Sequence, residues 1–167
     1  MITEAVAASS SQAARAAALD ELYGGYTAAV DAHEWQRWPG FFTEQCSYTV
    51  RTLENVEQGL PLAYMLDDNR ARLLDRVKFV TEVWAGTIEP YRTRHFVQRV
   101  LMTDLGDGSL RVRANLLVSY TEAEGIAAIL ASGYYDDLVQ LSESGALFVE
   151  RNVYLDGIPG RYLVYPL

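Results

Sequence analysis

The feature that most constrains the fold of this chain is a change in the spacing of its apolar residues at Pro90. Before Pro90, apolar residues recur mainly every three or four positions, as on one face of a helix. After Pro90 they alternate with polar residues, as in strands with one buried face. Helices followed by hairpin-connected strands predict an α+β domain with a largely antiparallel sheet, which must curl over the N-terminal helices.

Two long amphipathic helices are predicted before Pro90. The first ends near Asp31-Ala32-His33, and a short helical piece over residues 34–42 follows it. The apolar stripe of the first helix is Leu19, Leu22, Tyr23, Tyr26, Ala29 and Val30. The second helix is predicted to start after Asp67-Asp68, which would cap its N-terminus, and to end near Trp84. Its expected stripe is Leu73, Leu74, Val77, Val80, Val83 and Trp84.

One strand is predicted between these helices and four after Pro90. The first carries Cys46, Tyr48 and Val50 on its buried face. The later strands are expected at 93–103, 110–121 and 126–141, with a last one around 147–155. In the 126–141 strand the buried face is predicted to include Ala127, Ile129, Ala131, Tyr135, Val139 and Leu141, with a bend or bulge at Gly133. In the last strand it is Leu147, Val149, Val153 and Leu155.

Length and charge limit the classes of protein that this chain fits. Its 167 residues predict a single domain over 11–167, preceded by a flexible tail at 1–10. With 14 Lys and Arg against 22 Asp and Glu, it lacks the basic surface that nucleic acids or anionic membranes require. No run of 18 apolar residues predicts a membrane span. The chain has a single cysteine, and its first residues do not resemble a signal peptide. Both features favour a cytoplasmic location.

The supply of metal ligands is small. His33 and His95 are the only histidines and Cys46 is the only cysteine, whereas a Rieske cluster needs two of each. A mononuclear iron site built from both histidines and Asp31 has no supporting local spacing. Phosphate-loop, dinucleotide and nucleophile-elbow motifs are missing as well. We therefore expect no metal or cofactor site in this chain.

One constellation keeps an enzymatic interpretation open. Asp31, Tyr48 and His95 would project into the pocket of a cone-shaped fold, where they would act as general acid and base. The alternative is that His95 is an ordinary hydrogen-bonded strand residue. The spacing of these residues alone favours the structural interpretation.

Arginines are concentrated around the second helix and the first long strand, which is unusual in an acidic chain. Arginine is favoured in interfacial ion pairs, so these side chains are candidates for contact with a partner protein. A solvated surface explains them equally well at this stage. The set is Arg70, Arg72, Arg76, Arg92 and Arg94.

Several motifs, taken in order, resemble the small subunits of aromatic-ring-hydroxylating dioxygenases over about residues 15 to 167. The exit of the first helix carries Asp31-x-x-x-Trp35-x-x-Trp38-Pro39-x-Phe41-Phe42, followed by Cys46-x-Tyr48. Further motifs are Glu54-Asn55-x-x-Gln58-Gly59-Leu60-Pro61-Leu62, the helix Asn69 to Val77, Thr93-Arg94-His95, and Gly133-Tyr134-Tyr135-x-Asp137. The Glu54 to Leu62 run and the last four residues are most similar to subunits that serve aromatic acids.

The resemblance implies the cone-shaped, cystatin-like fold of nuclear transport factor, with helices packed on a curved sheet. It also implies a complex of three large and three small subunits, with trimer contacts between the small ones. In that family the large subunit carries the Rieske cluster, the mononuclear iron and the substrate pocket, and the small subunit is non-catalytic. The same fold occurs in ketosteroid isomerase and scytalone dehydratase, so a stand-alone enzyme using Asp31, Tyr48 and His95 is the alternative.

Overall fold

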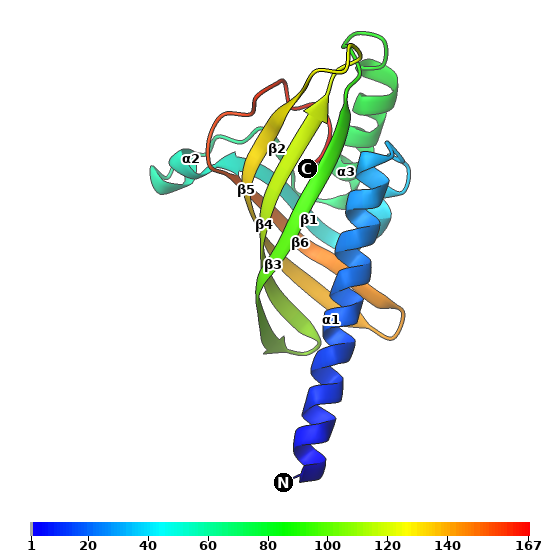
Figure 1. Cartoon of the computed structure of the whole chain (residues 1–167), viewed down its shortest axis with the longest axis vertical. Helices are drawn as coiled ribbons and strands as arrows, with labels where there is room; N and C mark the ends of the chain where they lie inside the picture. Colours follow the sequence, from blue (N-terminus) through cyan, green and yellow to red (C-terminus); the bar gives the residue numbers. More distant parts are fainter. Residues whose placement is uncertain (1) are drawn as a thin grey trace.

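The computed structural model describes residues 2–167, with side chains from residue 11 onward, so the tail predicted at 1–10 lies outside the described side chains. Helices dominate the first half and long strands the second (Figure 1). The helical elements are α1 (Ile2–Asp31), a 3-10 turn (Trp38–Phe41), α2 (Leu53–Glu57), α3 (Arg70–Lys78) and a π-helical turn (Phe79–Val83). The strands are β1 (Phe42–Thr52), β2 (Met65–Asp67), β3 (Arg92–Gly106), β4 (Ser109–Thr121), β5 (Ala127–Ser142) and β6 (Gly145–Leu155).

The strands form one six-stranded sheet in the order β2-β1-β6-β5-β4-β3. All pairs are antiparallel except β1 with β6, so the predicted α+β class with a largely antiparallel sheet is confirmed. The helix α1 runs along the sheet, and α3 lies beside its C-terminal end (Figure 1). No helix in the described part of the chain is long and apolar enough to cross a membrane.

The apolar stripe predicted for α1 is confirmed. Leu19, Tyr26 and Val30 have no exposed surface, and the other members of the stripe are buried as well. They contact the concave face of the sheet, which is itself lined by alternate residues of β4 such as Val112 and Val118. Burying such side chains contributes about 1.5–3 kcal/mol each, which outweighs the weak helix propensity of Gly24 and Gly25.

The prediction for the second helix was partly wrong. Its N-cap is Asn69, whose side chain accepts the Arg72 backbone N–H at 3.1 Å, because β2 extends to Asp67 and leaves no room for an earlier start. The inner stripe of Leu73, Val77 and Val80 is buried, but Trp84 is 41% exposed. A π-helical turn precedes Trp84 and rotates it away from the stripe. Leu74 and Val83, also predicted to be buried, are exposed as well.

Bulges explain the errors in the predicted strand faces. Between β4 and β5 the register shifts at Leu130, so that Leu130 is buried and Ile129 is 59% exposed, opposite to the prediction. Between β5 and β6 the shift falls at Val149, and Phe148 replaces Leu147 and Val149 in the core. An extra residue in one strand turns the following side chains to the other face and bends the strand.

The inside of the cone is filled by side chains and by the last residues of the chain. Leu167 is fully buried, and its backbone N–H donates to the Tyr48 hydroxyl at 2.8 Å. The Tyr26 hydroxyl donates to the Leu167 carbonyl at 2.7 Å and accepts from the Trp38 indole at 3.0 Å. These bonds satisfy polar groups deep in the core, where unpaired ones would be costly.

Candidate functional site

Asp31 and His95, predicted as members of one site, are joined in the structure. Asp31 is the last residue of α1, and His95 lies on the edge strand β3. The Asp31 carboxylate contacts Nδ1 of His95 at 2.7 Å and accepts the His95 backbone N–H at 3.0 Å. It also accepts the Thr93 hydroxyl at 2.8 Å. These three bonds fix the end of α1 to the sheet.

The electrostatics of this pair favour a charged carboxylate. Burial alone would raise the pKa of Asp31, but the hydrogen bonds from His95 and Thr93 outweigh burial and lower the pKa. Nε2 of His95 is buried and has no hydrogen-bond partner within the described part of the chain. A carboxylate that orients an imidazole is an arrangement that general bases use. The His95 side chain has no exposed surface, however, and the Asp31 side chain is only 13% exposed, although His95 is among the residues that line a second cavity of about 410 Å³.

Tyr48, the third residue of the predicted constellation, is not joined to the pair. Its hydroxyl is bonded to the Leu167 backbone. Burial raises the pKa of Tyr48 well above its usual value, which keeps the phenol protonated. The structure thus brings together two of the three predicted acid–base residues.

His33 and Cys46, the remaining potential metal ligands named above, are packed against other side chains. His33 contacts the rings of Trp35 and Tyr165, with centroids 5.0 and 4.8 Å away, and these two rings also stack on each other at 4.9 Å. Cys46 is buried on β1, and burial raises the pKa of its thiol. Across the described residues, no three His, Cys, Asp or Glu side chains are grouped so that they could hold a metal ion.

Two of the five arginines that were candidates for partner contact form hydrogen bonds within the chain. Arg70 donates to the carbonyls of Pro39 and Phe42 at 3.0 and 3.1 Å and ties α3 to the 3-10 turn. Arg76 makes two hydrogen bonds with the buried Asp67 carboxylate of β2. These contacts hold α3 against the sheet.

The other three arginines lie at the surface. Arg72 forms an exposed ion pair with Asp68 at 3.2 Å. Arg92 and Arg94 are exposed on β3, and the Arg94 guanidinium donates only to the neighbouring Thr93 carbonyl at 3.0 Å among the bonds of the described chain. Exposed pairs of this kind contribute about 0–1 kcal/mol, so these side chains are available to a partner.

Sequence reasoning missed a buried ion pair between β5 and β6. Arg151 and Asp137 are both fully buried and lie 2.9 Å apart. Tyr23 of α1 donates its hydroxyl to the same carboxylate at 2.5 Å. Asp137 follows Tyr135 and precedes Val139 at a spacing of two, so a charge on the predicted buried face was the available signal.

The fold and the comparisons together define a class of cone-shaped α+β proteins. The β subunit assigned to an aromatic-ring-hydroxylating dioxygenase of Novosphingobium aromaticivorans superposes with a TM-score of 0.81 and 27% identity, covering 94% of this chain and 99% of that chain. A protein assigned as a scytalone dehydratase from the same organism matches with a TM-score of 0.68 and 16% identity, covering 88% of this chain and 87% of that chain. At that identity the second likeness shows the fold alone.

Sequence comparison then distinguishes between these neighbours. The model of the ring-hydroxylating β-subunit family matches residues 27–158, and the chain belongs to this family. The small subunit of anthranilate 1,2-dioxygenase from Burkholderia cepacia is 29% identical over 135 residues, which cover 81% of this chain and 83% of that subunit. The predicted family and cone-shaped fold are therefore confirmed.

Proposed function

We propose that this chain is a structural small subunit that binds and supports the catalytic large subunit of a cytoplasmic dioxygenase. Membership of the β-subunit family is the observation that carries the proposal. In the proposed complex the large subunit holds the Rieske cluster and the mononuclear iron. Three large and three small subunits would assemble, with contacts between the small ones.

An aromatic acid is the proposed substrate class of the complex. The relative from Burkholderia cepacia is named for anthranilate, an aromatic acid. The chain itself would then affect turnover through the stability of the complex, because the His95 side chain of the Asp31–His95 pair has no exposed surface.

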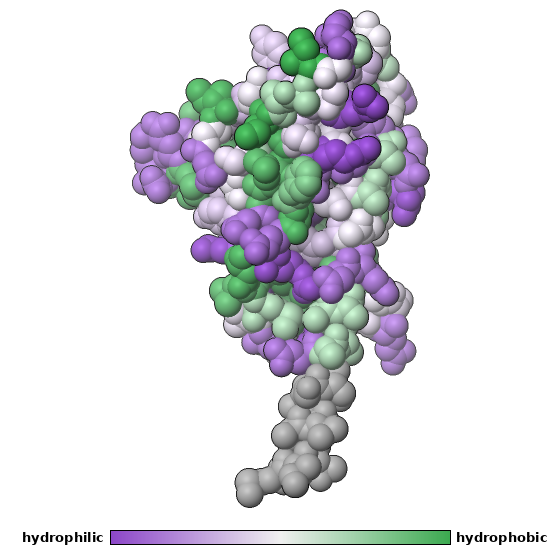
Figure 2. Space-filling model, viewed as in Figure 1, coloured by the Kyte–Doolittle hydropathy of each residue, from purple (hydrophilic) through white to green (hydrophobic). Residues whose placement is uncertain are grey.

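The outer face of the sheet is the surface that best fits a protein partner. Phe96 on β3 pairs with Leu117 on β4, and these side chains are 60% and 39% exposed. Ile129 on β5 and Arg94 on β3 lie on the same face in the adjacent row, and both pair with Ser119. Figure 2 shows hydrophobic residues gathered over the upper parts of β3, β4 and β5, above a band of hydrophilic ones. We call these four residues, Arg94, Phe96, Leu117 and Ile129, the outer sheet patch.

Charges placed in the outer sheet patch should disrupt the complex. Replacing both Phe96 and Leu117 with aspartate should weaken association with the cognate large subunit by about thirtyfold or more, as loss of interface hot spots does. Both side chains are exposed in the isolated chain, so the cost to its own stability should stay at about 1 kcal/mol, from the two carboxylates that would face each other across the strands. Sedimentation velocity of the co-expressed subunits measures the effect.

A matched variant separates this surface from general effects of added charge. Val56 and Leu74 are 39% and 48% exposed and lie on α2 and α3, away from the outer sheet patch. Replacing both with aspartate should leave assembly intact. If this control loses the complex while the Phe96 and Leu117 variant keeps it, the partner binds the helical side instead.

The Asp31–His95 pair offers a test against the stand-alone enzyme. Under the proposal, Asp31→Asn and His95→Gln should each lower the free energy of unfolding by about 1–3 kcal/mol, because each leaves a buried partner unpaired. Hydroxylation per assembled complex should stay unchanged. A general base behaves otherwise, since its loss reduces the rate by about a hundredfold to ten-thousandfold with the fold intact. Such a loss in an activity of the isolated chain would contradict the proposal.

The same variants have a defined pH dependence. The folded pKa of Asp31 is lowered, so its stabilising contribution is present above the unfolded pKa and is lost as the pH falls through the folded value. Below about pH 4, the wild-type chain should therefore lose part of its advantage over Asp31→Asn. Urea unfolding measured at a series of acidic pH values tests this.

A further inference from the structure

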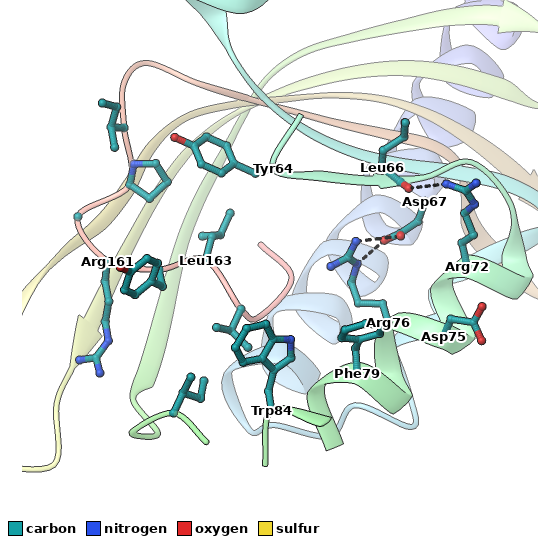
Figure 3. Close-up of a pocket in the computed structure, with 16 residues that line it drawn as sticks. Tyr64, Leu66, Asp67, Arg72, Asp75, Arg76, Phe79, Trp84, Arg161 and Leu163 are labelled. Atoms are coloured by element: carbon teal, nitrogen blue, oxygen red, sulfur yellow. Dashed lines mark hydrogen bonds and ion pairs between the residues drawn. The ribbon is translucent and has the colours of Figure 1, made fainter. Parts of the chain in front are cut away.

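A cavity of about 1150 Å³ lies between α3, the π-helical turn and the segment 158–164 (Figure 3). Its size slightly exceeds the usual range of pockets that hold small molecules, which is about 300–1,000 Å³. Leu66 and Tyr64, at and before β2, form one wall, and Leu163 of the C-terminal segment forms another. The Asp31–His95 pair is not among the residues that line it.

Aromatic rings are exposed on both sides of this cavity. Phe79 and Trp84 are 51% and 41% exposed at the two ends of the π-helical turn, and Tyr64 is 46% exposed opposite them. In a regular helix, Trp84 would lie in the same row as Leu73 and would be buried. The bond from the Trp84 N–H to the Phe79 carbonyl, at 2.8 Å, spans five residues and turns the indole into the cavity instead. Turns of this kind occur frequently at functional sites.

One polar group in the lining of the cavity is held in place. Arg76 uses Nε and Nη2 to bind the buried Asp67 carboxylate. Its Nη1 has no hydrogen-bond partner anywhere in the described chain, and the guanidinium extends from α3 toward the open space in Figure 3. The cavity therefore offers a held hydrogen-bond donor beside apolar walls.

The arginines around the cavity are already paired with carboxylates, and Asp75 adds a further negative charge to its lining. Arg76 is neutralised by Asp67, and Arg72 faces Asp68 at 3.2 Å. Arg161 contacts Glu122 at 2.6 Å and Glu89 at 3.5 Å. The whole chain carries a net charge of −8, so an anionic ligand gains no net attraction here. A neutral ligand avoids the cost of removing a charge from water.

We propose that this cavity binds a neutral aromatic molecule that carries one hydrogen-bond acceptor, such as an aryl ketone or a phenol. The ring packs against Phe79 and Trp84, and the acceptor oxygen receives a hydrogen bond from Nη1 of Arg76. This site lies in the small subunit itself, and the inference stands on the cavity rather than on assembly with a large subunit.

Calorimetric titration of the full chain with three matched probes tests the chemistry. Acetophenone supplies the ring and a carbonyl oxygen, ethylbenzene lacks the acceptor, and benzoate carries a full negative charge. Acetophenone should bind about threefold to tenfold more tightly than ethylbenzene, as expected for one net hydrogen bond. It should also bind more tightly than benzoate. Equal or tighter binding of benzoate, or no binding of acetophenone, would overturn the proposal.

Two variants locate the site. Trp84→Ser should weaken acetophenone binding about tenfold, the effect of losing a buried aromatic contact. Phe96→Ser removes a ring of similar exposure from the outer sheet patch and should leave binding unchanged. Each variant is first checked for a wild-type melting temperature. If both variants weaken binding equally, the probe binds nonspecifically and the proposal fails.

A spectroscopic measurement gives an independent result. Trp35 and Trp38 are 8% and 1% exposed, so Trp84 is the tryptophan that a ligand in the cavity can contact. Acetophenone should shift the Trp84 indole N–H resonance and leave those of Trp35 and Trp38 in place. A shift confined to the other two would place the ligand elsewhere. If Trp84→Ser abolished assembly with a large subunit while no probe shifted its indole signal in the wild type, the cavity would be a docking surface instead, and the proposal would be wrong.

Discussion

Replacing Arg151 with methionine should lower the free energy of unfolding by about 3–5 kcal/mol, because the fully buried Asp137 carboxylate would lose its cation. Removing one member of a buried ion pair leaves a charge without solvent or partner. The Tyr23 hydroxyl would remain as a single hydrogen-bond donor to Asp137. One neutral donor does not replace a guanidinium that makes three contacts with the same carboxylate.

The surroundings of Arg151 increase the expected loss. Its guanidinium carbon lies 3.8 Å from the Tyr135 ring centroid, 3.9 Å from that of Phe148 and 4.1 Å from that of Tyr26. Desolvated cation–π contacts contribute about 2 kcal/mol or more. Methionine retains part of the apolar packing but loses the attraction to these rings.

The loss should depend on pH. Burial raises the pKa of Asp137, and Arg151 is the main group that opposes this rise. Without Arg151 the carboxyl takes up a proton more readily, so the raised folded pKa makes the variant lose stability as the pH increases. Urea unfolding should therefore show a larger deficit at neutral pH than in mild acid.

Two further variants make the result interpretable. In Arg151→Met combined with Asp137→Leu no unpaired charge remains, so part of the lost stability should return. Arg113→Met removes an arginine that is 50% exposed, lies over the Tyr134 ring and contacts Asp136 at 3.5 Å. Its cost should stay below about 1 kcal/mol. A deficit for Arg151→Met no larger than that of Arg113→Met would show that the ion pair is unimportant for stability.

The parts of the fold that were predicted correctly are those with an uninterrupted period. The stripe containing Leu19 and Tyr26 lies on a regular helix, and the alternation from Leu110 to Val118 lies on a strand without an internal bulge. The wrong predictions for Ile129, Leu147 and Trp84 adjoin an inserted residue, at Leu130, at Val149 and at the π-helical turn. A single inserted residue leaves the composition of a segment unchanged, so the pattern does not reveal where the buried face reverses.

The candidate site was predictable only where local spacing locates a residue. Asp31 and His95 were both foreseen, because each stands at the boundary of a predicted element. Tyr48 was placed with them, although its hydroxyl binds a segment 119 residues away in sequence, at Leu167. Arginines such as Arg70 and Arg94 look equivalent in the sequence, yet one binds backbone carbonyls and the other is exposed. Such long-range contacts are set by the tertiary fold rather than by local spacing.

Replacing Gly133 with alanine should have an effect comparable to that of losing the ion pair. A Cβ atom at this position would lie 1.9 Å from the Tyr154 carbonyl oxygen and 3.0 Å from the Leu155 Cα. Both are backbone atoms of β6, and β5 is hydrogen-bonded on both sides, so neither strand can move without breaking its ladder. The φ angle of +158° adds strain for any residue with a side chain.

We expect Gly133→Ala to lose more than about 4 kcal/mol, which leaves a domain at the lower end of ordinary stability only about 1 kcal/mol from unfolding. The soluble fraction after expression and the melting temperature of any recovered protein measure the effect. Gly157→Ala is the matched control, because a Cβ there would meet no atom within 4 Å. If Gly133→Ala were as soluble and as stable as Gly157→Ala, the close approach of β5 and β6 at this position would be wrong.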